Sequence, residues 1–259
     1  NSVDDFWSSL VAGESGAGPI THFEAEDYKT KIAAEINDFD IKDFGFDRKE
    51  AKRMDRYTQF AVAAAKQAVA DAQLEIDEEN EYDVGAIVGS GIGGIETLEN
   101  QHERLLDRGP NRITPFLVPK MIANLAAGQV AITTGAKGPN SSVVSACATG
   151  THSLGEAYEI IKRGDAEAMI AGGAEAAITP LSMAGFCSLQ AMSTNNEDPE
   201  GASRPFDAKR DGFVMGEGAG VLVLETLENA RERGAEIYAE LDGYGQSADA
   251  HHITAPDPE

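Results

Sequence analysis

The sequence predicts an α/β protein built on a largely parallel sheet. Short apolar runs typical of strands alternate along the chain with longer stretches of helical periodicity, which is the pattern of parallel strands joined by crossover helices. Several of these runs contain no polar residue, as expected of strands that helices cover on both faces. The composition agrees, because 42% of the 259 residues are hydrophobic and 27 are glycine, which indicates a globular chain.

The expected elements follow in chain order. An amphipathic segment at 3–11 opens the chain. Asp47 is expected to cap a helix, because Glu50 three residues later completes a capping box. That helix should run without interruption to about Asp71. Beyond it we expect strands at 84–90, 143–146, 168–171, 221–224 and 237–241, and helices at 95–106, 120–132, 152–161 and 227–233.

The charge of the chain bears on its partners and its location. The formal net charge is -23, which argues against a nucleic-acid partner because phosphates would be repelled. No apolar run approaches the roughly 18 residues of a membrane helix, and the first residues lack the regions of a signal peptide. Two cysteines do not make a disulfide framework in a chain of this length. We therefore expect a cytoplasmic protein with no membrane association.

The segment Gly89-Ser90-Gly91-Ile92-Gly93-Gly94 fits the pattern G-x-G-x-x-G between a strand and a helix. Dinucleotide-binding proteins place this pattern there, with an acidic residue closing a second strand about 20 positions later. The corresponding region here, 107–111, resembles the end of a helix followed by a turn. The favoured interpretation is a tight turn that lets another segment pass close by, with dinucleotide binding as the alternative.

Cys147 has the sequence context of a nucleophile. A β-branched run at 143–146 leads directly into it, and a helix of small residues follows. A sharp strand-to-helix turn exposes its side chain, and the positive end of the helix macrodipole favours the reactive thiolate. The Cys147 amide, free at a helix start, can donate to an oxyanion. The alternative is a small buried hydrophobic residue, which is the interpretation favoured for Cys187.

The five histidines show no metal-binding pattern, so no metal site is expected. His152 follows Cys147 by five positions on the same helix and should point away from the sulfur. The pair His251-His252 is expected in an exposed loop.

Several segments resemble, in the right order, the β-ketoacyl-acyl-carrier-protein synthase family of the thiolase-like superfamily. The resemblance is strongest to the ketosynthases that elongate long acyl chains on a discrete carrier, and it covers essentially the whole chain. Cys147 occupies the nucleophile motif of that family. The other matching segments are 48–50, 53–55, 89–94, 109–110, 114–116, 172–175, 203–207 and, most specifically, 210–220.

The resemblance implies a thiolase-like fold with α-β-α-β-α layers and two similar halves. Residues 1–235 would form the N-terminal half without its first strand, and 236–259 would begin the C-terminal half. It also implies a 3-oxoacyl-[acyl-carrier-protein] synthase of fatty acid biosynthesis, acting as a homodimer. Cys147 would take the acyl chain from the phosphopantetheine thiol of the acyl carrier protein, and decarboxylated malonyl-carrier protein would then attack it. No cofactor is implied beyond the phosphopantetheine of the carrier.

Three substrate-binding residues are implied by the same resemblance. Ile92 and Phe186 would line the acyl channel, and Thr254 would lie near the pantetheine entrance.

A docking surface for the carrier is suggested by charge. Arg48, Lys52 and Arg56 recur at i, i+4 and i+8, with Lys49 and Arg53 beside them, and would form one basic stripe on a helix. An acidic carrier protein needs such a positive patch to approach a chain of this charge. The alternative is an ordinary solvated helix face.

The two catalytic histidines and the lysine of the family would lie beyond Glu259, so we expect this segment alone to be inactive in condensation. We also expect it to fold poorly, because a central strand and the facing half would be absent. Three other functions remain open. A polyketide ketosynthase would differ in acyl chain length. A non-catalytic carrier-binding subunit would lack the nucleophile, which the presence of Cys147 argues against. A thiolase would act on coenzyme A esters, but 210–220 does not match the thiolase pattern.

Overall fold

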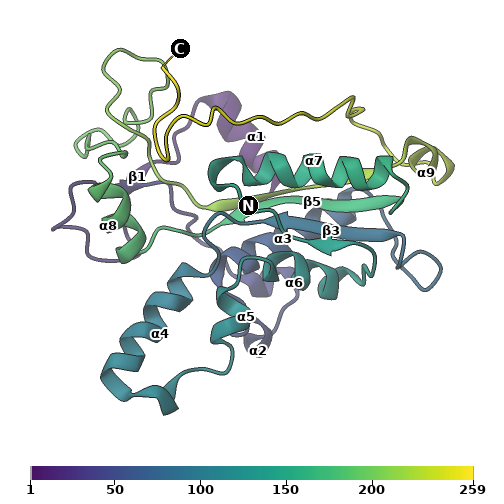
Figure 1. The fold of residues 1–259 in the computed structure, drawn as a ribbon, viewed down its shortest axis with the longest axis horizontal. Coiled ribbons are helices and arrows are strands. Elements are labelled where there is room, and N and C mark those ends of the chain that lie inside the picture. The colour runs from purple at the N-terminus through teal and green to yellow at the C-terminus, as the bar shows by residue number, and fades with distance from the viewer. Residues whose placement is uncertain (1, 259) are drawn as a thin grey trace.

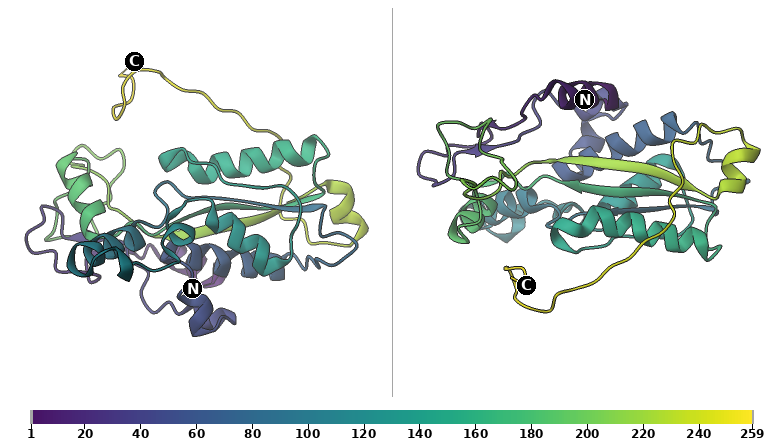
Figure 2. Two further views of the ribbon diagram at one scale, coloured as in Figure 1. Left: turned by 60° about the horizontal axis from the view of Figure 1, so that its bottom comes forward. Right: turned by 90° about the horizontal axis from the view of Figure 1, so that it is seen from above.

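The computed structural model describes residues 2–258. Its centre is a four-stranded sheet with the order β4-β3-β5-β6. Helix α7 packs on one face of this sheet, and helices α3 and α6 pack on the other (Figures 1 and 2). The α/β class predicted from the sequence is therefore confirmed, in three layers within this part of the chain.

The strands of the central sheet are mostly parallel. β3 (Val84–Gly89) pairs in parallel with both β4 (Asn140–Ser141) and β5 (Ala168–Glu175), whereas β6 (Gly218–Glu225) runs antiparallel to β5. All six residues of β3 are buried, as their apolar run predicts. A separate two-stranded sheet joins β1 (Gly18–Pro19) to β2 (Ile32–Ala33).

Three of the expected helices are confirmed, at 95–106, 152–161 and 227–233. The amphipathic segment at 3–11 also forms a helix. The helix expected at 120–132 is interrupted and forms α5 and α6 instead. Helix α8 was not predicted, although Pro180 at its first turn and the capping side chain of Thr179 are recognisable start signals. The bounds are α1 Val3–Ala12, α2 Arg48–Ala51, α3 Arg56–Asp71, α4 Ile95–Arg108, α5 Leu117–Met121, α6 Leu125–Thr134, α7 Thr149–Lys162, α8 Pro180–Ser188 and α9 Leu227–Glu232.

The core lies on both faces of the central sheet. Beneath it, α3 and α6 contribute small and aromatic residues, including Tyr57, Ala61 and Val130, to a cluster that also contains Val88. Above it, Ile87 and Met169 pack against the α7 side. The alternation of strand residues between the two faces thus places successive side chains in separate clusters.

The single helix expected from Asp47 to Asp71 is wrong. Its capping box is confirmed, since Asp47 accepts from the amides of Lys49 and Glu50, but α2 ends after four residues. The chain then turns inward, and the Asp55 carboxylate accepts from the amide and hydroxyl of Thr97 at 3.1 and 2.5 Å. Burial of Met54 and Asp55 therefore separates α2 from α3.

Two of the expected strands are also wrong. Residues 143–146 form no strand, because pairing with β3 ends at the preceding β4. The Ser145 amide donates to the Thr149 hydroxyl at 2.9 Å and not to a neighbouring strand. The segment 237–241 is irregular and pairs with none of the strands within residues 2–258. It belongs to the extended C-terminal segment, which stands away from the sheet (Figure 2). None of the described helices is both long and apolar enough to span a membrane.

Candidate active site

Cys147 lies on a short turn that leads into α7. Ala146, Cys147 and Ala148 form a single 3₁₀ turn, and α7 begins at Thr149. The amides of Ala148 and Thr149 close the turn by donating to the carbonyl oxygens of Ser145 and Ala146. The Cys147 amide comes before these two donors and takes part in neither hydrogen bond. The Cys147 side chain is exposed. The expectation that Cys147 opens a helix with an accessible side chain is met by this geometry.

The backbone immediately before Cys147 is strained. Ala146 has φ 50°, a left-handed conformation that is uncommon for a residue with a side chain. Ser145 is fixed on both sides, since its amide donates to Thr149 and its hydroxyl lies 2.7 Å from Nδ1 of His152. These two contacts tie the turn to the first two turns of α7. His152 therefore contacts the turn through Ser145.

The glycine-rich segment after β3 surrounds a half-buried carboxylate. Glu175, at the end of β5, accepts from the Ser90 hydroxyl at 2.9 Å and from the amides of Gly91 and Ile92 at 2.8 and 3.2 Å. The loop amides that could bind a phosphate are thus already occupied by a carboxylate of the same chain. A Cβ at Gly94 would overlap the Lys120 carbonyl oxygen. The interpretation as a tight turn with a close chain passage is confirmed.

The glycine loop and the nucleophile turn lie next to each other. A Cβ added to Gly91 would lie 3.5 Å from the Ala146 carbonyl oxygen and 2.9 Å from a Glu175 oxygen. Ile92, the next residue of the loop, is 39% exposed. The carboxyl ends of β3 and β5 therefore bring together Cys147, the glycine loop and Glu175.

The other residues expected at the site lie further along the chain. Phe186 on α8 is half-buried and packs edge-on against Phe213, with ring centroids 5.6 Å apart. Its cluster also contains Ile95, at the start of the helix that follows the glycine loop. Cys187 is half-buried in the same cluster, which agrees with the packing role expected for it.

Thr254 is not brought to the nucleophile turn. It is exposed in the C-terminal segment, where its amide donates to Nδ1 of His252 at 3.1 Å. That segment contacts the core elsewhere, since the Tyr244 ring lies against Gly155 and His152 on α7. The role of Thr254 stays a prediction.

The expected basic stripe is wrong in its geometry. Arg48, Lys49 and Lys52 line a surface hollow around Asp47, on and just after α2. Arg53 is also exposed, and its guanidinium carbon lies 5.5 Å from the centre of the Phe116 ring. Arg56 is not part of this group, because it lies on α3, beyond the break that separates α3 from α2.

Comparison with known proteins decides the family. Residues 1–230 match the family model described as the N-terminal domain of beta-ketoacyl synthases. The chain belongs to the β-ketoacyl synthase family. It is 54% identical over its whole length to proteins named 3-oxoacyl-[acyl-carrier-protein] synthase 2 from Synechocystis sp. and Staphylococcus aureus. The chain spans 62% and 64% of the length of these two relatives.

Solved structures of ketosynthases share the fold. A β-ketoacyl synthase from Burkholderia phymatum aligns with 98% of this chain and 62% of its own, at a TM-score of 0.88 and 36% identity. A polyketide ketosynthase described in complex with its acyl-carrier protein aligns with 97% of this chain and 60% of its own, at 0.86 and 32% identity. These similarities confirm the thiolase-like fold expected from the sequence.

The stability of this family member is expected to depend on pH through Glu175. Burial raises the pKa of the Glu175 carboxyl, although hydrogen bonds from Ser90, Gly91 and Ile92 oppose the change. A group whose pKa is higher in the folded state stabilises fully below its unfolded pKa of about 4.3, and loses that contribution as pH rises through the folded value. The contribution of Glu175 to the free energy of unfolding should therefore fall as pH rises from about 4.3 through the folded-state pKa of this carboxyl.

The matched variant is Glu175→Gln, because a glutamine oxygen can still accept from both loop amides but cannot ionise. Urea denaturation at pH 4.5 and pH 8 should show wild type losing stability relative to Glu175→Gln as pH rises. Other carboxyls whose pKa is raised, such as Asp55 and Glu96, titrate in both proteins and cancel in the comparison. If the difference in unfolding free energy between wild type and Glu175→Gln is the same at both pH values, the expected titration of Glu175 is contradicted.

Proposed function

We propose that this chain is the nucleophile-bearing part of a 3-oxoacyl-[acyl-carrier-protein] synthase of fatty acid biosynthesis, an acyltransferase of the cytoplasm. The observation that carries the proposal is the exposed Cys147 on a strained turn at the start of α7, beside the glycine loop. Its support comes from membership of the family and from 54% identity to relatives of that name. The division into 1–235 and 236–259 is proposed on the same grounds.

In the proposed first step, the Cys147 thiolate attacks the thioester carbonyl of an acyl carrier protein. The Cys147 amide donates to the oxyanion that forms. The bond to the pantetheine sulfur then breaks, the pantetheine leaves as a thiolate and takes up a proton equivalent to the one that Cys147 released, and the acyl group remains on Cys147 as a new thioester. Cys147 lies two residues before the first residue of α7 and is exposed, so the carrier thioester can reach its sulfur.

In the proposed second step, malonyl-carrier protein loses carbon dioxide, and the carbanion attacks the acyl group on Cys147. The Cys147 sulfur leaves, and the product is a 3-oxoacyl-carrier protein. Stabilising the carbanion requires donors aimed at its enolate oxygen. We assign none of these donors to residues 2–258, so the complete reaction is proposed for the longer polypeptide acting as a homodimer.

The acyl channel is proposed to pass Ile92 and Phe186, with Thr254 near the pantetheine entrance. Ile92 is supported by its position on the loop beside the nucleophile turn and by its partial exposure. Phe186 is supported by its packing in the cluster that includes Ile95. A narrower channel at either position should shift the longest accepted acyl chain to a shorter one.

The test of the proposal is a condensation assay on the full-length polypeptide. Acyl-carrier proteins of increasing chain length are supplied with malonyl-carrier protein, and products are identified by mass spectrometry. Fatty 3-oxoacyl-carrier products would support the proposal. Repeated condensation to polyketide chains would instead support a polyketide ketosynthase. The observation behind this second candidate is 35% identity to the ishigamide ketosynthase/chain length factor. Carrier binding without acyl transfer would identify a non-catalytic partner.

Carrier docking is proposed at Arg48, Lys49, Lys52 and Arg53. Reversing two of these charges with Lys49→Glu and Lys52→Glu should raise KM for acyl-carrier protein by about tenfold or more and change kcat little, because surface charges mainly steer association. The effect should shrink as salt is added. The matched control is Lys162→Glu on α7, which lies outside this group. An equal rise in KM in the control would contradict docking at this surface.

A further inference from the structure

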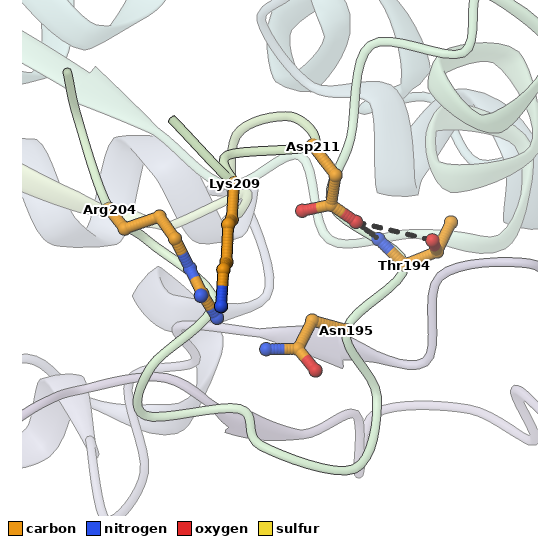
Figure 3. Close-up of a pocket in the computed structure, with 5 residues that line it drawn as sticks. All are labelled: Thr194, Asn195, Arg204, Lys209 and Asp211. Carbon is orange, nitrogen blue, oxygen red and sulfur yellow. Dashed lines mark hydrogen bonds between the residues drawn. The ribbon is translucent and has the colours of Figure 1, made fainter. Parts of the chain in front are cut away.

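A polar pocket that does not include Cys147 in its lining lies between the segments 194–195 and 204–211. It has a volume of about 300 Å³ and is lined by Thr194, Asn195, Arg204, Lys209 and Asp211. The end of the Lys209 side chain lies beside the guanidinium of Arg204, with the amide nitrogen of Asn195 turned toward both (Figure 3). Two cations thus converge on one hollow in a chain whose net charge is -23.

Neither cation has an acidic partner within residues 2–258. No ion pair or side-chain hydrogen bond joins Arg204 or Lys209 to the rest of the described chain, and the buried Nε of Arg204 has no acceptor. A buried donor without a partner costs free energy, and two cations side by side repel each other. An anion bound between them would remove both penalties.

The nearby acids are already committed to the backbone. Asp198 accepts from the amide of Gly201 at 3.2 Å, and Asp207 accepts from the amide of Lys209 at 2.6 Å. Asp211 accepts from the Ser193 hydroxyl at 2.6 Å and from the Thr194 amide at 2.8 Å, bonds that lower the pKa of its carboxyl. These carboxylates hold the loops in place, and none neutralises the two cations directly.

The lining of the pocket matches a phosphate group. A guanidinium presents a fork of donors, an ammonium adds a point charge, and these two cations outnumber the one carboxylate in the pocket. Asn195 uses one amide hydrogen on the Asp198 carbonyl, at 3.3 Å, and keeps the other. We propose that Arg204, Lys209 and Asn195 form a phosphate-binding site that is independent of the proposed chemistry at Cys147.

The site is tested on the full-length polypeptide in a buffer without phosphate, by isothermal titration calorimetry at constant ionic strength. Inorganic phosphate is the first probe, acetate reports binding of any carboxylate, and methyl phosphate stands for a phosphate ester. Phosphate is expected to bind at least about tenfold more tightly than acetate, because it engages more charged donors. Tighter binding of methyl phosphate would identify an ester as the natural ligand, and weaker binding would identify free phosphate.

The decisive variant is Lys209→Gln, because Lys209 is exposed and its loss should not disturb folding. It is expected to weaken phosphate binding by about tenfold or more, as is Arg204→Lys, which keeps the charge but removes the fork. The matched control is Lys162→Gln, which should bind phosphate as wild type does.

Two results would overturn the proposal. One is phosphate binding that is no tighter than acetate binding or that is unchanged in Lys209→Gln. The other is a structure of the full-length polypeptide in which a carboxylate from another segment or subunit occupies the pocket.

Discussion

Replacing Cys147 with alanine is expected to abolish acyl transfer by the full-length polypeptide, lowering its rate by a factor on the order of 10⁴ or more. The reason is that no covalent route remains once the sulfur at the start of α7 is removed. The measurement is intact-mass spectrometry after incubation with an acyl-carrier protein. Wild type should gain the mass of one acyl group per chain, and Cys147→Ala should gain none.

The matched control is Cys187→Ala, because the chain offers a second cysteine of different exposure. Cys187 packs half-buried on α8, whereas Cys147 is exposed. Cys187→Ala should acquire the acyl group at close to the wild-type rate. An acyl adduct that persists in Cys147→Ala, or that disappears in Cys187→Ala, would remove the basis for calling Cys147 the nucleophile.

Removing Arg56 is expected to be strongly destabilising. Its guanidinium donates to the Glu217 carboxylate at 2.7 and 3.1 Å and to the Ile36 carbonyl at 2.7 Å. The Glu217 side chain is only 1% exposed. Arg56→Met would leave this carboxylate buried without its main partner, and loss of one member of a buried ion pair costs about 3–5 kcal/mol of unfolding free energy.

The comparison that tests this uses an exposed ion pair. Lys42 lies 2.8 Å from Asp40, and both side chains are about half exposed. Lys42→Met should therefore cost no more than about 1 kcal/mol. Urea denaturation of both variants gives the two losses directly. Similar losses for Arg56→Met and Lys42→Met would mean that Glu217 finds water or another partner once Arg56 is gone. His22, whose Nε2 lies 3.8 Å from a Glu217 oxygen, is such a partner.

The features predicted correctly from the sequence depend on neighbouring residues. The capping box of Asp47 and Glu50 spans three positions, so its geometry is almost independent of the rest of the fold. The tight turn at Gly93 and Gly94 follows from glycine conformations, since Gly93 has φ 74°. The exposed position of Cys147 was predicted from the change at that residue, where a β-branched run typical of a strand gives way to a helix of small residues. Local signals therefore identified the candidate nucleophile and its loop.

The features that were missed depend on contacts between distant residues. The break before α3 is stabilised by Asp55 and Thr97, which are 42 positions apart. Ser90 and Glu175, which organise the glycine loop, are 85 positions apart. The segment 143–146 has strand propensity, but its Ser145 amide donates to the Thr149 hydroxyl and not to a neighbouring strand. No periodicity or spacing in the sequence signals such pairs, although a glutamate that follows the apolar run 168–171 was a usable hint.

The alanine at position 146 has a consequence for protein engineering. A search for thermostable variants would select glycine there, because glycine adopts φ 50° without strain and would relax the turn. The same change would let the thiol-bearing turn sample more orientations, and a reaction centre gains speed from being held in one of them. Position 146 is thus a site where selection for heat resistance and selection for turnover pull in opposite directions.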